Sequence, residues 1–225
     1  MALDRELSLR RAEKLLRQGR LDGAIEEYER LVEDQPNDWN TRNALGDLYV
    51  RAGQVEKAAQ QFTHIADHFA EEGFFSRAIA LFKKVVKIRP DDEYALLQSA
   101  EVAARQGLLV DAKACLAAIA EQRRRRGDRT GANQILQRIA ELDPADVSAR
   151  VNAARAAVED GNAAGAATQY RDLATELFGR GREQEAIDAL AEAVGLVPDD
   201  DDARELLVRA YLKAGDIARA RNHAT

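Results

Sequence analysis

Several residue types are scarce in this sequence of 225 residues: it has one cysteine, four prolines and 5% aromatic residues. The single cysteine, Cys115, excludes an internal disulfide and favours a reducing compartment, so we expect a cytoplasmic protein. No apolar run approaches the roughly 18 residues that a membrane span needs. The charged start, MALDRELSLRRAEK, lacks the apolar core of a secretory signal. We therefore expect no insertion into a membrane.

Motifs that carry catalysis are missing as well. No glycine-rich phosphate loop precedes a helix pattern, no Ser-His-Asp arrangement is present, and Cys115 has no plausible histidine partner. His64 and His68 have the i, i+4 spacing of two metal ligands on one helix face. The equivalent positions elsewhere in the chain vary, so we expect a solvated face instead. The sequence predicts a protein that is not an enzyme and has no catalytic residue, cofactor or metal site.

The balance of charged and apolar residues is typical of long amphipathic helices. Apolar residues make up 46% of the chain and charged residues 32%, with alanine and leucine prominent. The net charge of −6 disfavours binding to nucleic acid, which usually requires a basic domain or stripe. The bias of 26 arginines against 7 lysines is typical of a GC-rich bacterial source.

The chain repeats itself at a constant interval, the one that separates Gly19 from Gly73. Six columns of four identical residues align at this step, and one of them contains every proline. The columns are Gly19, Gly73, Gly127 and Gly181; Gly53, Gly107, Gly161 and Gly215; Ala24, Ala78, Ala132 and Ala186; Ala58, Ala112, Ala166 and Ala220; Pro36, Pro90, Pro144 and Pro198; and Asp38, Asp92, Asp146 and Asp200. We expect a single domain over 1–225 that contains four super-repeats, 9–62, 63–116, 117–170 and 171–224.

The columns have physical reasons, which together predict three helices in each super-repeat. Glycine accepts the left-handed conformation that ends a helix, and proline stops the helix before it. The aspartates then cap the next helix, and the alanines lie where two helices cross closely. In the second super-repeat we expect helices over 55–71, 75–89 and 94–106. The whole chain should have about thirteen helices and no strand.

The stretch ALGDLYVRAGQVEKAAQQF resembles the tetratricopeptide repeat, a helix-turn-helix unit of about 34 residues. The family's pattern is matched by Leu45, Gly46, Tyr49, Gly53, Ala58 and Phe62. The resemblance implies an all-α fold, a right-handed α-solenoid of about thirteen helices. The small-residue alanines recur at alternating long and short steps, and the short step, as from Ala58 to Ala78, leaves no room for a fresh helix pair. We therefore expect shared, longer helices near 55–71, 109–126 and 163–180.

The end of the chain does not complete this pattern. Thr225 aligns with Thr63, so the last helix stops about nine residues before its expected glycine. Either the last helix is a stub or the chain is the N-terminal part of a longer protein, and we favour the longer protein. Stacked repeats expose an apolar end unless a polar cap covers it, so self-association through the C-terminal end is also possible.

The resemblance further implies a scaffold or adaptor that binds a protein or peptide in the groove of the solenoid. Carried onto this chain, the groove positions are Asn40, Asn43, Asp47, Tyr94, Leu97, Glu101, Val151, Arg155, Glu205 and Arg209. Family members that clamp a chaperone's terminal carboxylate use a fixed set of lysines and asparagines. Asn43 has no matching lysines at the following groove positions, so we do not expect that role.

A second set of candidate partner-binding residues consists of one aromatic residue and a basic patch. They are Trp39 and the arginines Arg123, Arg124, Arg125, Arg126 and Arg129. The simpler interpretation of the arginines is a solvated helix end that complements the helix dipole. The alternative is a docking site for an acidic partner, a phosphate or a nucleic acid. A further alternative makes the solenoid the regulatory domain of an enzyme that lies beyond Thr225.

Overall fold

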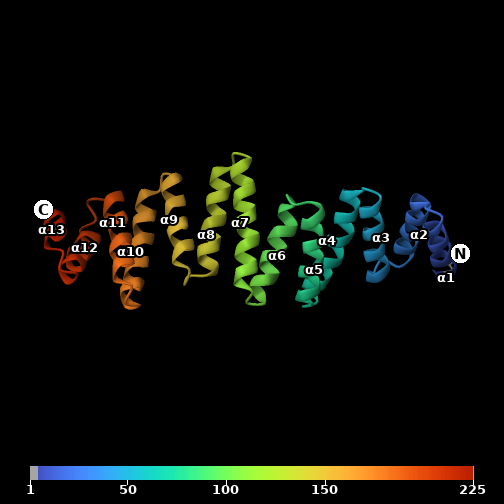
Figure 1. Ribbon diagram of the computed structural model, residues 1–225, viewed down its shortest axis with the longest axis horizontal. Coiled ribbons are helices and arrows are strands. Elements are labelled where there is room, and N and C mark those ends of the chain that lie inside the picture. Colours follow the sequence, from blue (N-terminus) through green and yellow to red (C-terminus); the bar gives the residue numbers. More distant parts are fainter. Residues whose placement is uncertain (1–4, 225) are drawn as a thin grey trace. The chain divides into compact units, whose positions relative to one another are not determined.

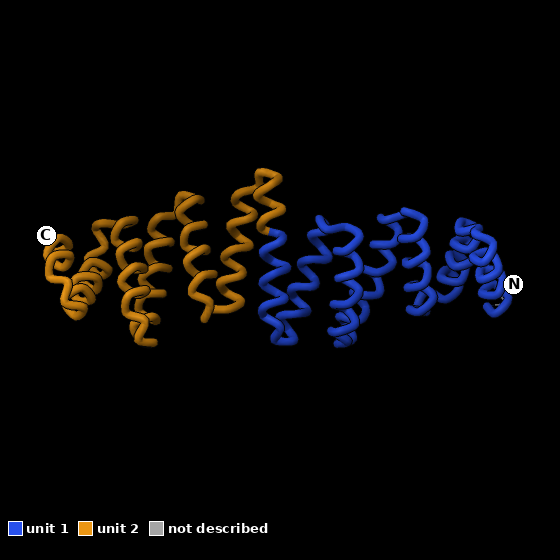
Figure 2. The backbone as a smooth tube through the Cα atoms, viewed as in Figure 1, with its two compact units in different colours: residues 1–119 blue, residues 120–225 orange. Residues whose placement is uncertain are grey.

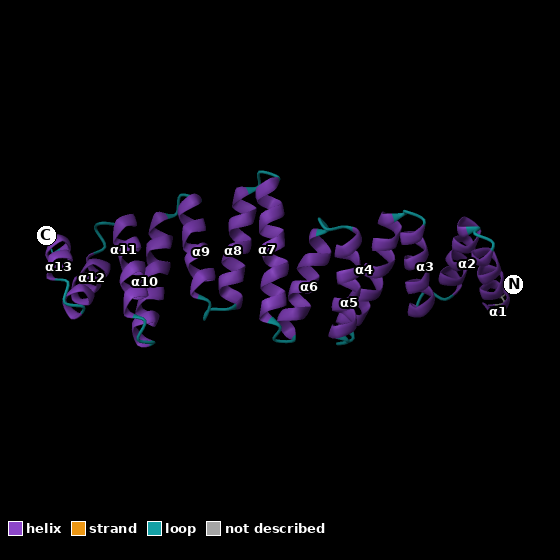
Figure 3. Ribbon diagram, viewed as in Figure 1, coloured by secondary structure: helices purple, strands orange, loops and turns teal. Residues whose placement is uncertain are grey.

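Helices account for all the regular secondary structure in residues 5–224, the part of the chain that the structure, a computed structural model, describes (Figures 1 and 3). The described helices are α1 (Arg5–Arg17), α2 (Leu21–Asp34), α3 (Trp39–Arg51), α4 (Val55–Glu71), α5 (Phe75–Ile88), α6 (Glu93–Arg105), α7 (Leu109–Arg125), α8 (Arg129–Leu142), α9 (Val147–Glu159), α10 (Ala163–Gly179), α11 (Glu183–Leu196), α12 (Asp201–Lys213) and α13 (Ile217–His223). The thirteen helices and the absence of strands in this part confirm the predicted fold class, an all-α solenoid.

The helix ends lie where the repeated residues predict them. All eight glycines of the two columns have positive φ angles, between +71° and +83°. The repeated aspartates cap α3, α6, α9 and α12 by accepting a hydrogen bond from the backbone N–H three residues later. The helices expected over 75–89 and 94–106 each end one residue earlier, and the second also begins one residue earlier.

The helices expected to be shared are the longest ones. Helices α4, α7 and α10 have 17 residues each, whereas α1 to α3, α5, α6, α8, α9, α11 and α12 have 13 or 14. Helix α4 packs against both α3 and α5, and α10 packs against both α9 and α11. Other helices, such as α3 and α5, also pack against both neighbours, so the greater length is what distinguishes α4, α7 and α10.

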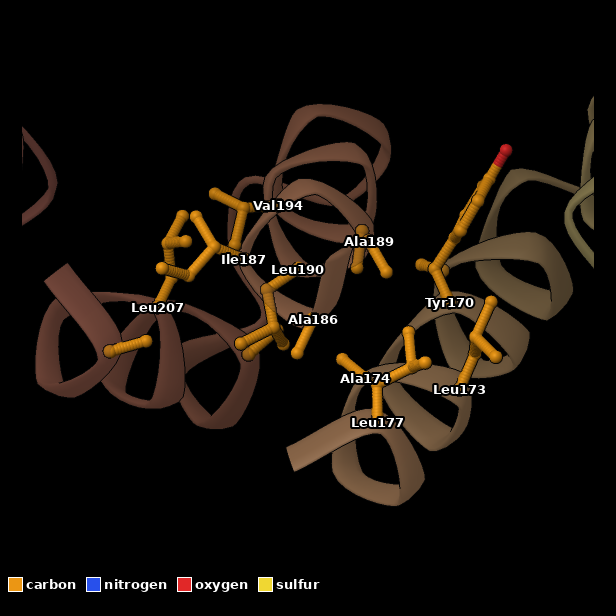
Figure 4. Close-up of a cluster of buried hydrophobic side chains, with 14 of the residues drawn as sticks. Tyr170, Leu173, Ala174, Leu177, Ala186, Ile187, Ala189, Leu190, Val194 and Leu207 are labelled. Carbon is orange, nitrogen blue, oxygen red and sulfur yellow. The ribbon is translucent and has the colours of Figure 1, made fainter. Parts of the chain in front are cut away.

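The alanine columns are buried in the core. Each of their eight members is at most 3% exposed, as expected where two helices cross closely. Larger side chains fill the space between these crossings. Figure 4 shows one such cluster, in which Ala174 and Leu177 of α10 lie beside Ala186 of α11.

The chain divides into two compact units, Met1–Ile119 and Ala120–Thr225, here called the N-terminal and the C-terminal unit (Figure 2). The division falls within α7. Successive helices pack against each other from α1 to α6 in the first unit and from α8 to α13 in the second. Helix α13 has seven residues, and Thr225 lies outside the described residues. Within the described part, no helix combines the length and the apolar character that a membrane crossing requires.

Candidate functional site

An open groove in the C-terminal unit contains two of the predicted groove residues, Val151 and Arg155. The groove lies between α9, α10 and α11 and has a volume of about 240 Å³. Its lining residues are Val147, Val151, Arg155, Tyr170, Leu173, Leu177, Glu185, Asp188, Ala189 and Glu192. The aromatic and aliphatic side chains come from all three helices. Tyr170, Leu173, Leu177 and Ala189 are buried. The apolar side chains that a partner can contact are therefore the half-buried Val147 and Val151 of α9.

The rim of this groove is acidic. Glu185, Asp188 and Glu192 follow one another at i, i+3 and i+7 on α11, so they share one face of that helix. Burial and the Glu192 charge raise the pKa of Tyr170, while a hydrogen bond with Arg155 opposes them. Three acidic residues against one arginine favour a ligand that carries positive charge.

The equivalent position in the N-terminal unit is filled by a side chain of the protein itself. Asn43 and Asp47 stand two super-repeats before Val151 and Arg155, at equivalent positions. The ammonium of Lys84 donates to Asn43 Oδ1 at 3.1 Å and to Asp47 Oδ1 at 2.8 Å, and it lies 4.5 Å from the ring centre of Phe62. A partner would have to displace this lysine to reach the same surface.

The other predicted groove residues do not join the open groove. Glu205 and Arg209 pair with each other on α12. Asn40 is exposed at the start of α3, and Leu97 and Glu101 are half-buried on α6. Tyr94 turns its hydroxyl toward α4 and donates to Asp67 Oδ1 at 3.0 Å.

Trp39 forms a separate site in the N-terminal unit, here called the Trp39 cleft. The cleft has a volume of about 690 Å³ and is lined by Asn37, Trp39, His64, Asp67, His68 and Glu71. The indole ring stacks on the imidazole of His68, with 4.2 Å between ring centres and 24° between the planes. Trp39 therefore packs on α4, the helix that follows it.

The arginine run at the end of α7 is largely paired with nearby groups of the same chain. Arg123 donates to the carbonyl oxygen of Gly131 at 3.1 Å, and Arg125 donates to Glu121 at 2.9 Å. Arg124 and Glu159 lie 3.8 Å apart, and together with Gly127 and Arg129 they line a cleft of about 640 Å³. These acidic neighbours reduce the positive potential that a phosphate would need. Docking at this patch stays a prediction.

The remaining chemistry-bearing residues show no assembled site. Among residues 5–224, no three His, Cys, Asp or Glu side chains come together in a way that could hold a metal ion. Cys115 is a free, half-buried thiol on α7. His64 is exposed, as expected, whereas His68 is half-buried under Trp39.

Comparison with protein families identifies the fold family. One tetratricopeptide repeat pattern matches residues 9–64, and a second matches residues 69–126 and 177–223, so the family covers most of the chain. The chain belongs to the tetratricopeptide repeat family. Comparison with curated proteins found no matching relative.

Comparison with solved structures found matches at low sequence identity, among them a tetratricopeptide repeat protein. A tetratricopeptide repeat protein from Parabacteroides merdae is 15% identical, with 92% of this chain and 98% of that chain covered and a TM-score of 0.27. MamA from Desulfovibrio magneticus, from residue 41 to its end, is 17% identical, with 99% and 93% covered and a TM-score of 0.23. BtubC from P. vanneervenii is 15% identical, with 99% and 91% covered and a TM-score of 0.38.

Three features of this tetratricopeptide repeat protein were not predicted from its sequence. Two of them are the hydrogen bond of Lys84 with Asn43 and the stacking of Trp39 on His68. Both are contacts between helices, which a single sequence does not show directly. The third is the acidic face of α11, which could have been predicted, because the i, i+3, i+7 spacing of Glu185, Asp188 and Glu192 is visible in the sequence.

Proposed function

We propose that this tetratricopeptide repeat protein is a non-catalytic adaptor that binds a protein segment in the groove of α9, α10 and α11. The observation that carries the proposal is the open apolar groove with its acidic rim. An amphipathic segment would place apolar side chains against the half-buried Val147 and Val151, above the buried Leu173 and Leu177. Its basic side chains would then face Glu185, Asp188 and Glu192.

The surroundings of the groove support binding to a protein segment. Leu173 and Leu177 are at most 2% exposed and belong to the packed core, so the floor of the groove is held rigidly. A rigid floor lowers the ordering cost of association. The half-buried Val151 and the exposed Arg155 stand above it, where a partner can reach them.

The free thiol of Cys115 fits a reducing compartment such as the cytoplasm.

Site-specific crosslinking tests this proposal. A photoreactive amino acid is placed at Val151 in one protein and at Val110, a valine of α7 that is 78% exposed and outside the groove, in another. Irradiation in an extract of the native cell should join a specific protein to position 151 and not to position 110. The identified protein should then bind purified wild type, and Val151→Arg should weaken that binding at least about tenfold by filling the groove, whereas Val110→Arg should not. Equal crosslinking from both positions, or equal binding by both arginine variants, would contradict the proposal.

A further inference from the structure

The Trp39 cleft combines a flat aromatic floor with acidic walls. Trp39 is the first residue of α3, and its ring lies 4.2 Å from the ring centre of His68 and 6.5 Å from that of Phe69. Asp67 and Glu71 are one turn apart on α4, and both line the same cleft. An aromatic face next to two carboxylates attracts a planar cation through both the ring and the charges.

Within the described residues, no lysine or arginine charge acts on the carboxylate of Asp67. The charged groups that act on it are Glu71 and His64. Burial raises the pKa of Asp67, the hydrogen bond from Tyr94 opposes it, and the Glu71 charge raises it further. The two negative charges repel each other, so a bound cation would relieve an unfavourable interaction.

His64 does not supply that cation at neutral pH. Burial lowers the pKa of His64 first, and the Arg42 charge lowers it further, while the charges of Asp67 and Glu71 act in the opposite direction. Arg42 is itself held away from the carboxylates, because it donates to the carbonyl oxygen of Pro36 at 3.0 Å and to Gln61 at 2.8 Å. The cleft therefore presents net negative charge to solvent.

We propose that the Trp39 cleft binds an arginine side chain of a partner protein. A guanidinium is planar and carries five donors, so it can stack on Trp39 while it donates to Asp67 and Glu71. The ammonium of lysine can also contact a ring and a carboxylate together, as Lys84 does with Phe62 and Asp47. It is a compact point charge, however, and lacks the planar face that a guanidinium stacks on an indole ring. The proposal stands on the residues of α3 and α4 and does not depend on the groove of α9 to α11.

The rings next to the cleft already show this chemistry within the chain. The guanidinium carbon of Arg77 lies 5.7 Å from the ring centre of Phe69 and 5.3 Å from that of Phe74. Phe74 and Tyr94 are 50% and 49% exposed. Exposed aromatic residues around a cleft are typical of protein interfaces, where a buried cationic or aromatic anchor contributes most of the affinity.

Trp39 also provides the measurement, because it is the single tryptophan of the chain. The full chain is titrated with N-acetylarginine methylamide while the tryptophan emission and the indole N–H chemical shift are followed. The matched probes are the corresponding derivatives of citrulline, which has the same shape without the charge, and of lysine. We expect a saturable change with arginine, a weaker one with lysine and none with citrulline.

Isosteric variants separate the charges from the fold. Asp67→Asn together with Glu71→Gln removes both charges and keeps the reporter and the shape of the cleft. Glu26→Gln together with Glu56→Gln changes the net charge equally at exposed positions outside the cleft. We expect the first double variant to weaken arginine binding at least about fivefold and the second to leave it within about twofold. Circular dichroism and thermal unfolding confirm that both variants are folded.

Three results would overturn the proposal: no saturable response to arginine, an equal response to citrulline, or unchanged affinity in the Asp67→Asn, Glu71→Gln variant. Each of them leaves the groove of α9 to α11 untouched, because neither the probes nor the variants involve its residues. Conversely, a failed crosslink at position 151 says nothing against arginine binding at Trp39. The two proposals therefore stand or fall separately.

Discussion

Gly46 lies where α3 meets the buried ring of Phe62 on α4. A Cβ atom at position 46 would be 2.6 Å from the nearest ring carbon, and Phe62 is 1% exposed, so the ring has little room to move. We expect Gly46→Ala to lower the free energy of unfolding by about 1–3 kcal/mol, despite the better helix propensity of alanine. Thermal or urea unfolding measures the change.

The matched control is Gly195→Ala in α11, where a Cβ atom would meet nothing within 4 Å. Here the gain in helix propensity should raise the stability by up to about 1 kcal/mol. If both variants shift stability in the same direction, close packing at position 46 is not the reason that glycine stands there.

Residues that recur in the repeat or match the family's pattern could be predicted from the sequence, and residues that depart from the pattern could not. Gly46 was identified because it matches the tetratricopeptide repeat pattern. Asn133 was not. Its equivalents are Ile25, Ile79 and Ile187, yet it is fully buried and donates to the carbonyl oxygen of Ala156 at 3.2 Å and to Asp160 Oδ1 at 2.9 Å. A polar residue such as Asn133 in a column of isoleucines shows that the environment of this position differs. The sequence does not show which groups the polar side chain contacts.

At the scale of the helix, the N-terminal caps link structure to pH. Asp38 accepts hydrogen bonds from the backbone N–H of Thr41 at 3.2 Å and from its hydroxyl at 2.7 Å, and it forms an ion pair with Arg5. Burial alone would raise the pKa of Asp38, but these hydrogen bonds and the Arg5 charge hold it below its usual value. The ionised cap therefore stabilises the folded state above the unfolded pKa of about 4, and this stability is lost as the pH falls through the lower folded value.

Asp38→Asn tests this relation, since asparagine also caps helices but cannot ionise. We expect the variant to be less stable than wild type at pH 6, and the difference to shrink as the pH is lowered from about 5 to about 2. Unfolding by urea at a series of pH values measures both proteins. A difference that stays constant across this range would show that the charge of Asp38 does not contribute.

The extent of the helices could be predicted almost to the residue, because it depends on local chemistry. Glycines with positive φ, capping aspartates and prolines all act on their own backbone or on residues within one turn. The groove and the Trp39 cleft depend instead on which side chains face each other across two or three helices. Asn43 and Val151 occupy equivalent positions. Lys84 of α5 covers Asn43, whereas Val151 lines an open groove.

For the molecule as a whole, the repeat organisation predicts that disturbances stay local. In a solenoid each repeat contacts its neighbours, so stability is approximately a sum of local contributions. We expect Gly46→Ala to accelerate amide hydrogen exchange in α3 and α4 and to leave α10 to α12 unchanged. Exchange measured by mass spectrometry resolves these segments. A uniform acceleration along the chain would indicate a single cooperative unit instead.

From α2 onward, the start of each helix recurs one super-repeat later, as in Leu21, Phe75, Arg129 and Glu183. If a gene gained or lost the codons of one super-repeat, equivalent positions of two super-repeats would become joined. The helices at the junction would keep the alanine, glycine and aspartate positions that they had before. Such a protein can change its reach in fixed increments during evolution without inventing a new joint. The surface carried by each increment is then free to diverge, as the lysine-covered and open positions of the two units already show.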